Sequence, residues 1–276
     1  MAIVTTDDKH YKNIAAVVRS CTGSSSLYKP SEMADAVYEA SEVRFDDGRT
    51  SGYMEGYTQG HEEGIQAEYD RFWDAFQENG NRTDYEYAFV GVAWTDEIFK
   101  PKYNITPTKA PFAFTSSKIS NIKNALERAG VTLDTSNCTN MNRIFYGSAT
   151  TVLPKIDFRA YHAIDNAFTI CSQLVEVSIV VDETVSYTDA FFSCSALENL
   201  TIEGTIGQNG FNVSWSTKLT HESLMSIINA LQDKTSAGGT WSITLGTANL
   251  AKLTTLRKRS LHRKDGHWHD NNQYRS

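Results

Sequence analysis

The sequence has no long apolar run, and none of its segments reaches the roughly 18 consecutive apolar residues that a membrane-spanning helix needs. We therefore expect no membrane span. The chain also opens without a basic segment followed by an apolar one, so no secretory signal is evident. With 40% hydrophobic and 21% charged residues among 276, it has the composition of an ordinary soluble protein that can build a sizeable core.

Patterns for catalysis and metal binding are missing as well. Even the two closest of the four cysteines, Cys171 and Cys194, are far apart in the sequence, which argues against a Cys-x-x-Cys pair. No phosphate loop, nucleophile elbow or known catalytic spacing occurs, and Asp157, Asp182 and His162 stand apart. We therefore expect no enzymatic activity, no catalytic or metal-binding residues and no cofactor, and we assign no ligand-binding residue. A carboxylate pair for glycoside hydrolysis stays an open alternative.

Charge is distributed unevenly along the chain. Seven basic and two acidic side chains give residues 252–276 a net charge of +5, which leaves −12 for the rest of a chain whose total is −7. An acidic body disfavours nucleic acid as the main partner. His262, His267 and His269 could be drawn as a metal site, but we expect a disordered tail over residues 255–276.

What the sequence does contain is a repeat between residues 130 and 204. The two best copies, residues 167–179 and 190–202, both read A-F-x-x-C-S-x-L-x-x-ψ-x-I, where ψ is aliphatic. Thr151 and Pro154 break this pattern in the preceding copy, which we expect to be a looser or edge coil. The positions that recur at one constant interval include Phe145, Phe168 and Phe191, and also Leu133, Ile156, Ile179 and Ile202.

This interval of about 23 residues, with aliphatic side chains at fixed positions, is the signature of a leucine-rich-repeat solenoid. We predict an α/β fold in which the x-ψ-x-I segments form a parallel sheet, with Ser178 and Thr201 facing outward. The aligned phenylalanines would form one column in the core. Cys171 and Cys194 would form another as small buried thiols, and a disulfide between them would require that adjacent coils bring the sulfurs together.

The repeat, with its lead-ins at residues 166–168 and 189–191, resembles the BspA-like leucine-rich repeats of bacterial surface proteins. Similar repeats occur in phage and prophage tail-associated proteins. Residues 14–37 read I-x-x-x-V-R-x-x-T-G-x-x-x-x-Y-K-P-S-E-M-A-x-A-V and are similar to a module that opens many phage tail and baseplate-associated proteins of Gram-positive hosts. Residues 219–254 resemble the element that closes the same group of repeat proteins.

The tail departs from the ending that is typical of this group. Codons exist that encode residues 256–269 in one frame and the typical ending in the neighbouring frame. We therefore hypothesise that the chain is frameshifted from about Thr255 onward. The nucleotide sequence of the gene tests this hypothesis, because a codon set that cannot give the second reading excludes it.

A glycine-rich connector precedes the repeat. On a helix, its glycines would form one stripe where a second helix could approach closely and build a dimeric or trimeric stalk. The alternative is a flexible acidic linker, since no apolar heptad seam runs beside them. The stripe consists of Gly52, Gly56, Gly60 and Gly64.

An aromatic face follows at helical spacing, formed by Tyr69, Phe72, Trp73 and Phe76. We expect it to pack on the first coil and cap it, with sugar binding as the alternative. We also predict a strand at 87–94, a helix at 119–129 ended by Gly130, a strand at 131–133, a helix at 221–231 capped by Thr220, and a strand at 241–245.

These features divide the chain into a helical module (1–48), a connector (49–78), a repeat solenoid with its N-terminal cap (79–204), a C-terminal cap (205–254) and the tail (255–276). The resemblance implies a non-enzymatic structural or recognition protein of a phage or prophage tail. It would be located in the virion or at a bacterial cell surface, and would bind a host cell-surface glycan or protein, or other tail proteins. The main alternative is a bacterial cell-surface or secreted adhesin with no virion role.

Overall fold

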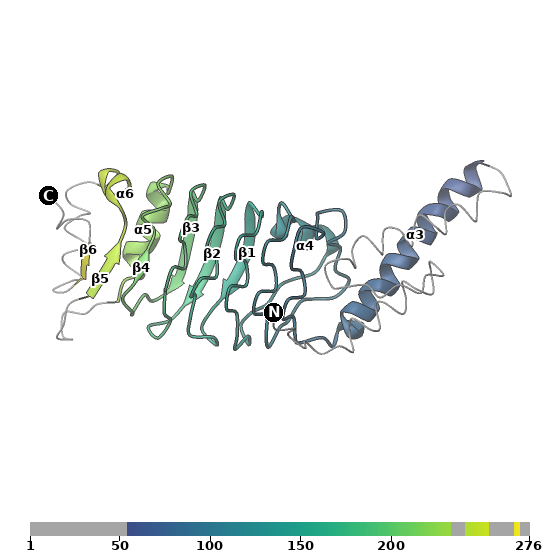
Figure 1. Ribbon diagram of the computed structural model, residues 1–276, viewed down its shortest axis with the longest axis horizontal. Coiled ribbons are helices and arrows are strands. Elements are labelled where there is room, and N and C mark those ends of the chain that lie inside the picture. Colours follow the sequence, from purple (N-terminus) through teal and green to yellow (C-terminus); the bar gives the residue numbers. More distant parts are fainter. Residues whose placement is uncertain (1–53, 233–240, 254–267, 271–276) are drawn as a thin grey trace, which may run out of the picture.

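The computed structural model describes residues 54–232, 241–253 and 268–270. The described chain forms an elongated body in which successive turns lie side by side along the long axis (Figure 1). Helix α3 (Met54–Phe76) lies at one end, and strands β5 (Trp241–Thr244) and β6 (Trp268–Asp270) lie at the other. The predicted module at 1–48 falls outside the described residues.

The centre of the body is a three-stranded parallel sheet in the order β1 (Val152–Asp157), β2 (Glu176–Val181) and β3 (Asn199–Gly204). Val177 pairs with Leu200 and Ile179 with Ile202, so the strands pair in the register of the sequence repeat. Alternate side chains of β2 and β3 are buried, as expected for strands with one face on a core. The prediction of an α/β fold with a parallel sheet is therefore confirmed.

Strand β1 is the irregular edge of this sheet, as Pro154 predicts. Val152 pairs with Glu176, but Lys155 pairs with Ser178, so β1 holds one more residue than β2 over this interval. Proline has no N–H to give to a sheet ladder and is tolerated at edges and bulges. The outer side of β1 is closed by Thr135, whose hydroxyl accepts from Asp157 N at 2.8 Å and donates to Asp157 O at 3.0 Å.

Phenylalanine rings form the predicted column behind the sheet. The rings of Phe145 and Phe168 stack at a centroid distance of 5.8 Å, and those of Phe168 and Phe191 stack at 5.2 Å. The column is longer than predicted, because Phe89 stacks on Phe114 at 4.6 Å and Phe114 stacks on Phe145 at 5.3 Å. All of these rings are buried, so the column runs through successive turns of the chain from Phe89 to Phe191.

Each of these phenylalanines sits in a tight backbone corner. The residues two positions before and two positions after the ring all have positive φ, and backbone N–H groups of one corner donate to carbonyls of the next. Examples are Phe114 N to Ile144 O at 2.7 Å and Phe168 N to Ala190 O at 3.1 Å. The residues with positive φ are Tyr87, Gly91, Phe112, Ser116, Arg143, Gly147, Asn166, Ile170, Asp189 and Ser193.

Two strand predictions are wrong. Residues 87–94 form the first phenylalanine corner, because the left-handed backbone of Tyr87 and Gly91 cannot continue an extended strand. Residues 131–133 form no strand either, and Leu133 makes only an isolated bridge to Ile105. Between these segments, helix α4 (Ile122–Ala129) ends at Gly130 as predicted, with φ of 68°. It begins later than expected because Asn121 caps it.

The aromatic face of α3 closes the first turn, as predicted. Phe72, Trp73 and Phe76 are buried, and the Phe76 ring lies 5.4 Å from the Phe89 ring that begins the column. Helix α3 passes into the short 3-10 helix η2 (Glu78–Gly80). The helical alternative for the glycine-rich connector is therefore the observed one over Met54–Phe76, whereas Gly52 falls outside the described residues.

The other end of the sheet is closed by helix α5 (His221–Ala230), which begins with the predicted Thr220 cap. Two serines of α5 take the place of a next strand, because Leu200 N donates to Ser223 Oγ at 2.9 Å and Ile202 N donates to Ser226 Oγ at 2.8 Å. Such contacts block further strand addition at β3. Short helix α6 (Thr247–Ala251) follows β5.

A second small parallel sheet has the order β4 (Phe211–Asn212), β5 and β6. Trp241 pairs with Trp268 and Ile243 with Asp270, so residues 268–270 of the tail form a strand. The prediction of disorder over the whole of 255–276 is therefore wrong for 268–270. The other residues of that range lie outside the described part.

Buried thiols occupy the predicted positions behind the corners. Cys171 Sγ donates to Phe145 O at 2.8 Å and Cys194 Sγ donates to Phe168 O at 3.0 Å, so each thiol bonds to the preceding turn. Both are free rather than joined in a disulfide. Burial raises the pKa of Cys171 to about 12, which keeps the thiol protonated and unreactive at neutral pH.

Two adjacent phenylalanines test the column. Phe191 is fully buried in it, whereas the side chain of Phe192 is 41% exposed. We expect Phe191→Ala to lower the free energy of unfolding by about 3–5 kcal/mol, because it removes a ring that is packed in the core. Phe192→Ala should cost about 1 kcal/mol or less. Urea denaturation of both variants measures the difference, and equal losses would contradict a stabilising role of the column.

Candidate recognition surface

The outward face of the sheet presents two rows of side chains across three strands. Pairing aligns Lys155 with Ser178 and Ser178 with Thr201 in the first row. The second row aligns Asp157, Val180 and Glu203 in the same way. Since the inward positions are filled by the core, the members of these rows other than the buried Asp157 are the part of the sheet that a partner can reach. Ser178 and Thr201 lie on this face as predicted.

A groove of about 560 Å³ opens over this face. One wall is formed by α4 and the segment after it, and the other by the outward residues of the sheet. Its lining combines polar loop residues, charged side chains and the apolar surfaces of Leu126 and Val180. The volume is in the range of small-molecule and side-chain binding sites. A bound group would therefore contact the sheet and α4 together.

Two ion pairs lie at this groove. Lys155 Nζ lies 3.2 Å from Glu203 Oε2, and Lys123 Nζ lies 3.3 Å from Glu176 Oε1. Their side chains are about half exposed, so these pairs contribute little to stability and can exchange partners. The groove thus offers both signs of charge to a polar ligand.

Acidic residues line the groove, which bears on the glycosidase alternative. Glu127, Asp134, Asp157 and Glu203 are all part of the lining. A glycosidase of this kind needs one carboxyl group with a raised pKa as the proton donor. Burial raises the pKa of Asp157, but hydrogen bonds from the Arg159 side chain and backbone outweigh this effect and hold the pKa below its usual value. Asp157 therefore stays ionised, and its oxygens are held by Arg159 at 2.6–3.2 Å.

His162 and Asp182 lie away from the groove. His162 Nδ1 is 2.7 Å from Thr184 Oγ1, which donates to Asp182 Oδ1 at 2.6 Å. With the threonine hydroxyl donating to the carboxylate, the histidine Nδ1 is the donor to the threonine oxygen in this arrangement. His162 and Asp182, which stand apart in the sequence, are thus joined at the surface by a positioning contact. Asp157 does not take part in it.

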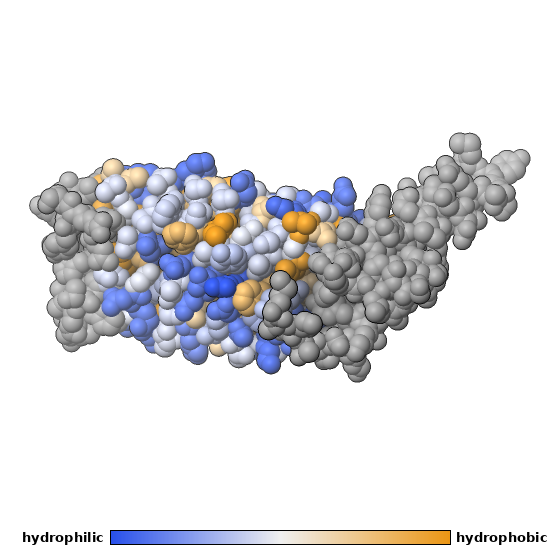
Figure 2. All heavy atoms as spheres, viewed as in Figure 1, coloured by the Kyte–Doolittle hydropathy of each residue, from blue (hydrophilic) through white to orange (hydrophobic). Residues whose placement is uncertain are grey.

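A separate apolar strip was not predicted from the sequence. It consists of Ile170, Phe192 and Trp215, which are 44%, 41% and 51% exposed. The carbonyl of Phe192 accepts a hydrogen bond from Ile170 N at 2.8 Å. The ring centroids of Phe192 and Trp215 lie 5.0 Å apart. Large exposed aromatics are typical of contact sites. The face drawn in Figure 2 is mostly hydrophilic, with small hydrophobic spots.

The described residues hold neither a metal cluster nor a membrane-spanning helix. Within 54–232, 241–253 and 268–270, no three His, Cys, Asp or Glu side chains gather closely enough to bind a metal ion. None of the helices in this part is long and apolar enough to cross a membrane. His262 and His267 lie outside the described residues, and His269 lies in β6.

Comparison with protein-family models, with curated proteins and with solved structures finds no match in any of the three.

Proposed function

We propose that this chain is a non-enzymatic recognition protein of a phage or prophage tail that binds a host cell-surface glycan or protein through its repeat domain. The observation that carries the proposal is the exposed sheet face with its groove. This face lies on a stack that is stabilised by its buried core. Paired charges and small polar groups on that face suit a hydrated, polar ligand. Binding to other tail proteins through the same face would be the second use.

We further propose that the stack is a BspA-like leucine-rich-repeat solenoid. The support is the constant offset between β2 and β3, the column of phenylalanines and the matching thiols of Cys171 and Cys194. In such arrays each repeat contacts only its neighbours, so both ends need caps. The aromatic face of α3 and the serines of α5 fill those roles here.

Helix α3 supports the idea of a stalk. It projects from the end of the body in Figure 1 and contains Gly56, Gly60 and Gly64 on one stripe. A Cβ placed on Gly64 would meet no atom within 4 Å, so nothing in the described part of the chain itself requires glycine there. A second copy of the chain packed along the stripe would require it. Several weak sites on one oligomer would then gain avidity.

The sheet face can be tested with one matched pair of substitutions. Val180 lies in the groove, whereas Val92 is 69% exposed in the first corner. We expect the fluorescently labelled full chain to bind saturably to intact Gram-positive cells, and Val180→Arg to weaken this binding at least about tenfold by filling the groove. Val92→Arg should bind like the wild type. Equal binding of the two variants, or no saturable binding to any strain, would contradict the proposal.

The virion role has its own measurement. Genes for tail proteins beside the gene of this chain, and the chain itself in purified phage particles, are the expected results. A chain found only on bacterial surfaces, with no tail genes nearby, would support the cell-surface adhesin instead.

Replacing a single glycine tests the stalk. Glycine costs a helix roughly 1 kcal/mol relative to alanine, so Gly64→Ala should stabilise an isolated α3. In a stalk with close helix approach, it should instead lower the oligomer mass measured by light scattering over a range of concentrations. The control is Gln66→Ala, which changes the opposite side of the helix. A wild-type monomer, with Gly64→Ala only more stable, would rule out the stalk.

A further inference from the structure

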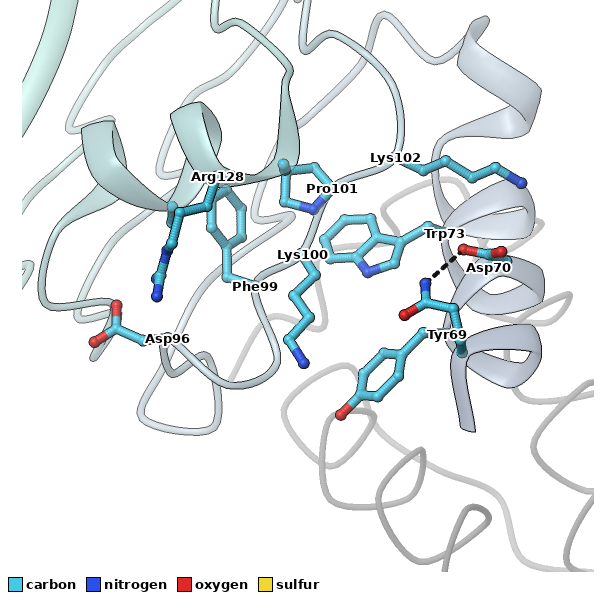
Figure 3. A pocket seen from close by; sticks show the side chains of 12 residues that line it. Tyr69, Asp70, Trp73, Asp96, Phe99, Lys100, Pro101, Lys102 and Arg128 are labelled. Atoms are coloured by element: carbon cyan, nitrogen blue, oxygen red, sulfur yellow. Dashed lines mark hydrogen bonds between the residues drawn. The ribbon is translucent and has the colours of Figure 1, made fainter. Parts of the chain in front are cut away.

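A second hollow lies on the other side of α4, between that helix, α3 and residues 96–102 (Figure 3). Its volume is about 450 Å³. Apolar surfaces of Trp73, Phe99 and Pro101 form one part of its lining, and Lys100 and Arg128 form a polar part. The sheet-face groove uses different residues of α4, so this cleft is a separate site.

The indole N–H of Trp73 faces this cleft without an acceptor. The side chain is 1% exposed, and its Nε1 has no hydrogen-bond partner within the described part of the chain. In Figure 3 the ring nitrogen lies on the edge turned toward Lys100 and Tyr69. A buried donor left unpaired is unfavourable, so a group that accepts from it removes that loss when it binds.

The acidic groups around the cleft are already engaged. Asp96 accepts from Ser120 N at 2.9 Å, and Asp70 accepts from Gln66 Nε2 at 3.0 Å. Lys102 is likewise held by Asp74, at 2.8 Å. The two neutral donors leave both carboxylates charged, but they place the acceptor oxygens of Asp70 and Asp96 on Gln66 and Ser120 rather than on a cation of the lining.

The lining also contains two cations besides Lys102, namely Lys100 and Arg128. Lys100 Nζ lies 4.7 Å from the centre of the Tyr69 ring, and Arg128 lies in the last turn of α4. Neither forms an ion pair with the part of the chain described here. An anionic acceptor placed near Lys100 could also reach the indole N–H, because both line the same cleft.

We propose that this cleft binds a small carboxylate carried on a six-membered ring. The carboxylate accepts from the Trp73 N–H and pairs with Lys100, while the ring packs on the apolar wall of Phe99 and Pro101. The volume is within the usual range for such ligands. An aromatic acid and an acidic sugar share this chemistry. Binding here does not depend on what the sheet face recognises.

The test titrates the full ¹⁵N-labelled chain with four probes: benzoate and its neutral analogue benzamide, and glucuronate and its neutral analogue glucose. The chain has five tryptophans, so its indole N–H groups give few cross-peaks, and Trp73→Phe identifies the relevant one. We expect at least one carboxylate to shift this peak and to bind at least about tenfold more tightly than its neutral analogue. Binding of benzoate would indicate an aromatic acid as the ligand class, and binding of glucuronate would indicate an acidic sugar.

The matched variants are Lys100→Gln and Lys218→Gln, both at exposed lysines. Lys100→Gln should weaken carboxylate binding about tenfold, measured by calorimetry, and Lys218→Gln should leave it unchanged. This comparison stands even where Trp73→Phe fails to fold. The proposal is overturned by the absence of binding at about 10 mM of either carboxylate, by neutral probes that bind equally well, or by an unchanged affinity in Lys100→Gln.

Discussion

Stacking of one turn of chain on the next is the constraint on which this structure depends. A single turn of about 23 residues has an apolar side that it cannot bury alone. Rings such as Phe145 and Phe168 therefore meet face to face, and backbone N–H groups of one corner bond to carbonyls of the next. The same stacking buries the thiols, which donate to carbonyls of the preceding turn and satisfy groups that water cannot reach.

Both ends of such a stack expose an unpaired surface, and the chain closes them by different means. At the first turn, Phe76 and Trp73 of α3 replace the ring that a preceding repeat would supply. At the last strand of the main sheet, Ser223 and Ser226 accept the N–H groups that another strand would have taken. Both caps therefore extend the core with buried apolar side chains, and the second also ends the hydrogen-bond ladder with two hydroxyl groups.

The sequence could reveal only the parts of the fold that recur at a constant interval. Ile179 and Ile202 follow that interval and pair as expected. Phe114 and Phe145 are separated by more than one repeat interval, because helix α4 is inserted between them. Phe114 and Phe89 therefore do not fit the constant interval and were not predicted to belong to the column. The Ala-Phe dipeptides at 88–89 and 113–114 were the available signal. Nothing in the residue type of Arg143 indicates a left-handed corner, since only neighbouring turns impose it.

The candidate sites were less predictable than the fold, because they depend on which side of an element faces which neighbour. A tryptophan in the aromatic face of a helix is expected to lie in the core, and Trp73 is indeed buried. Only the three-dimensional arrangement shows that its N–H has no acceptor in the described part of the chain. The outward residues of the sheet are less constrained than the inward ones. Since the column, the ladder of corners and the caps supply the stability, side chains such as Thr201 and Glu203 are free to vary without loss of the fold. A stack built in this way can change its outer side chains while keeping its interior.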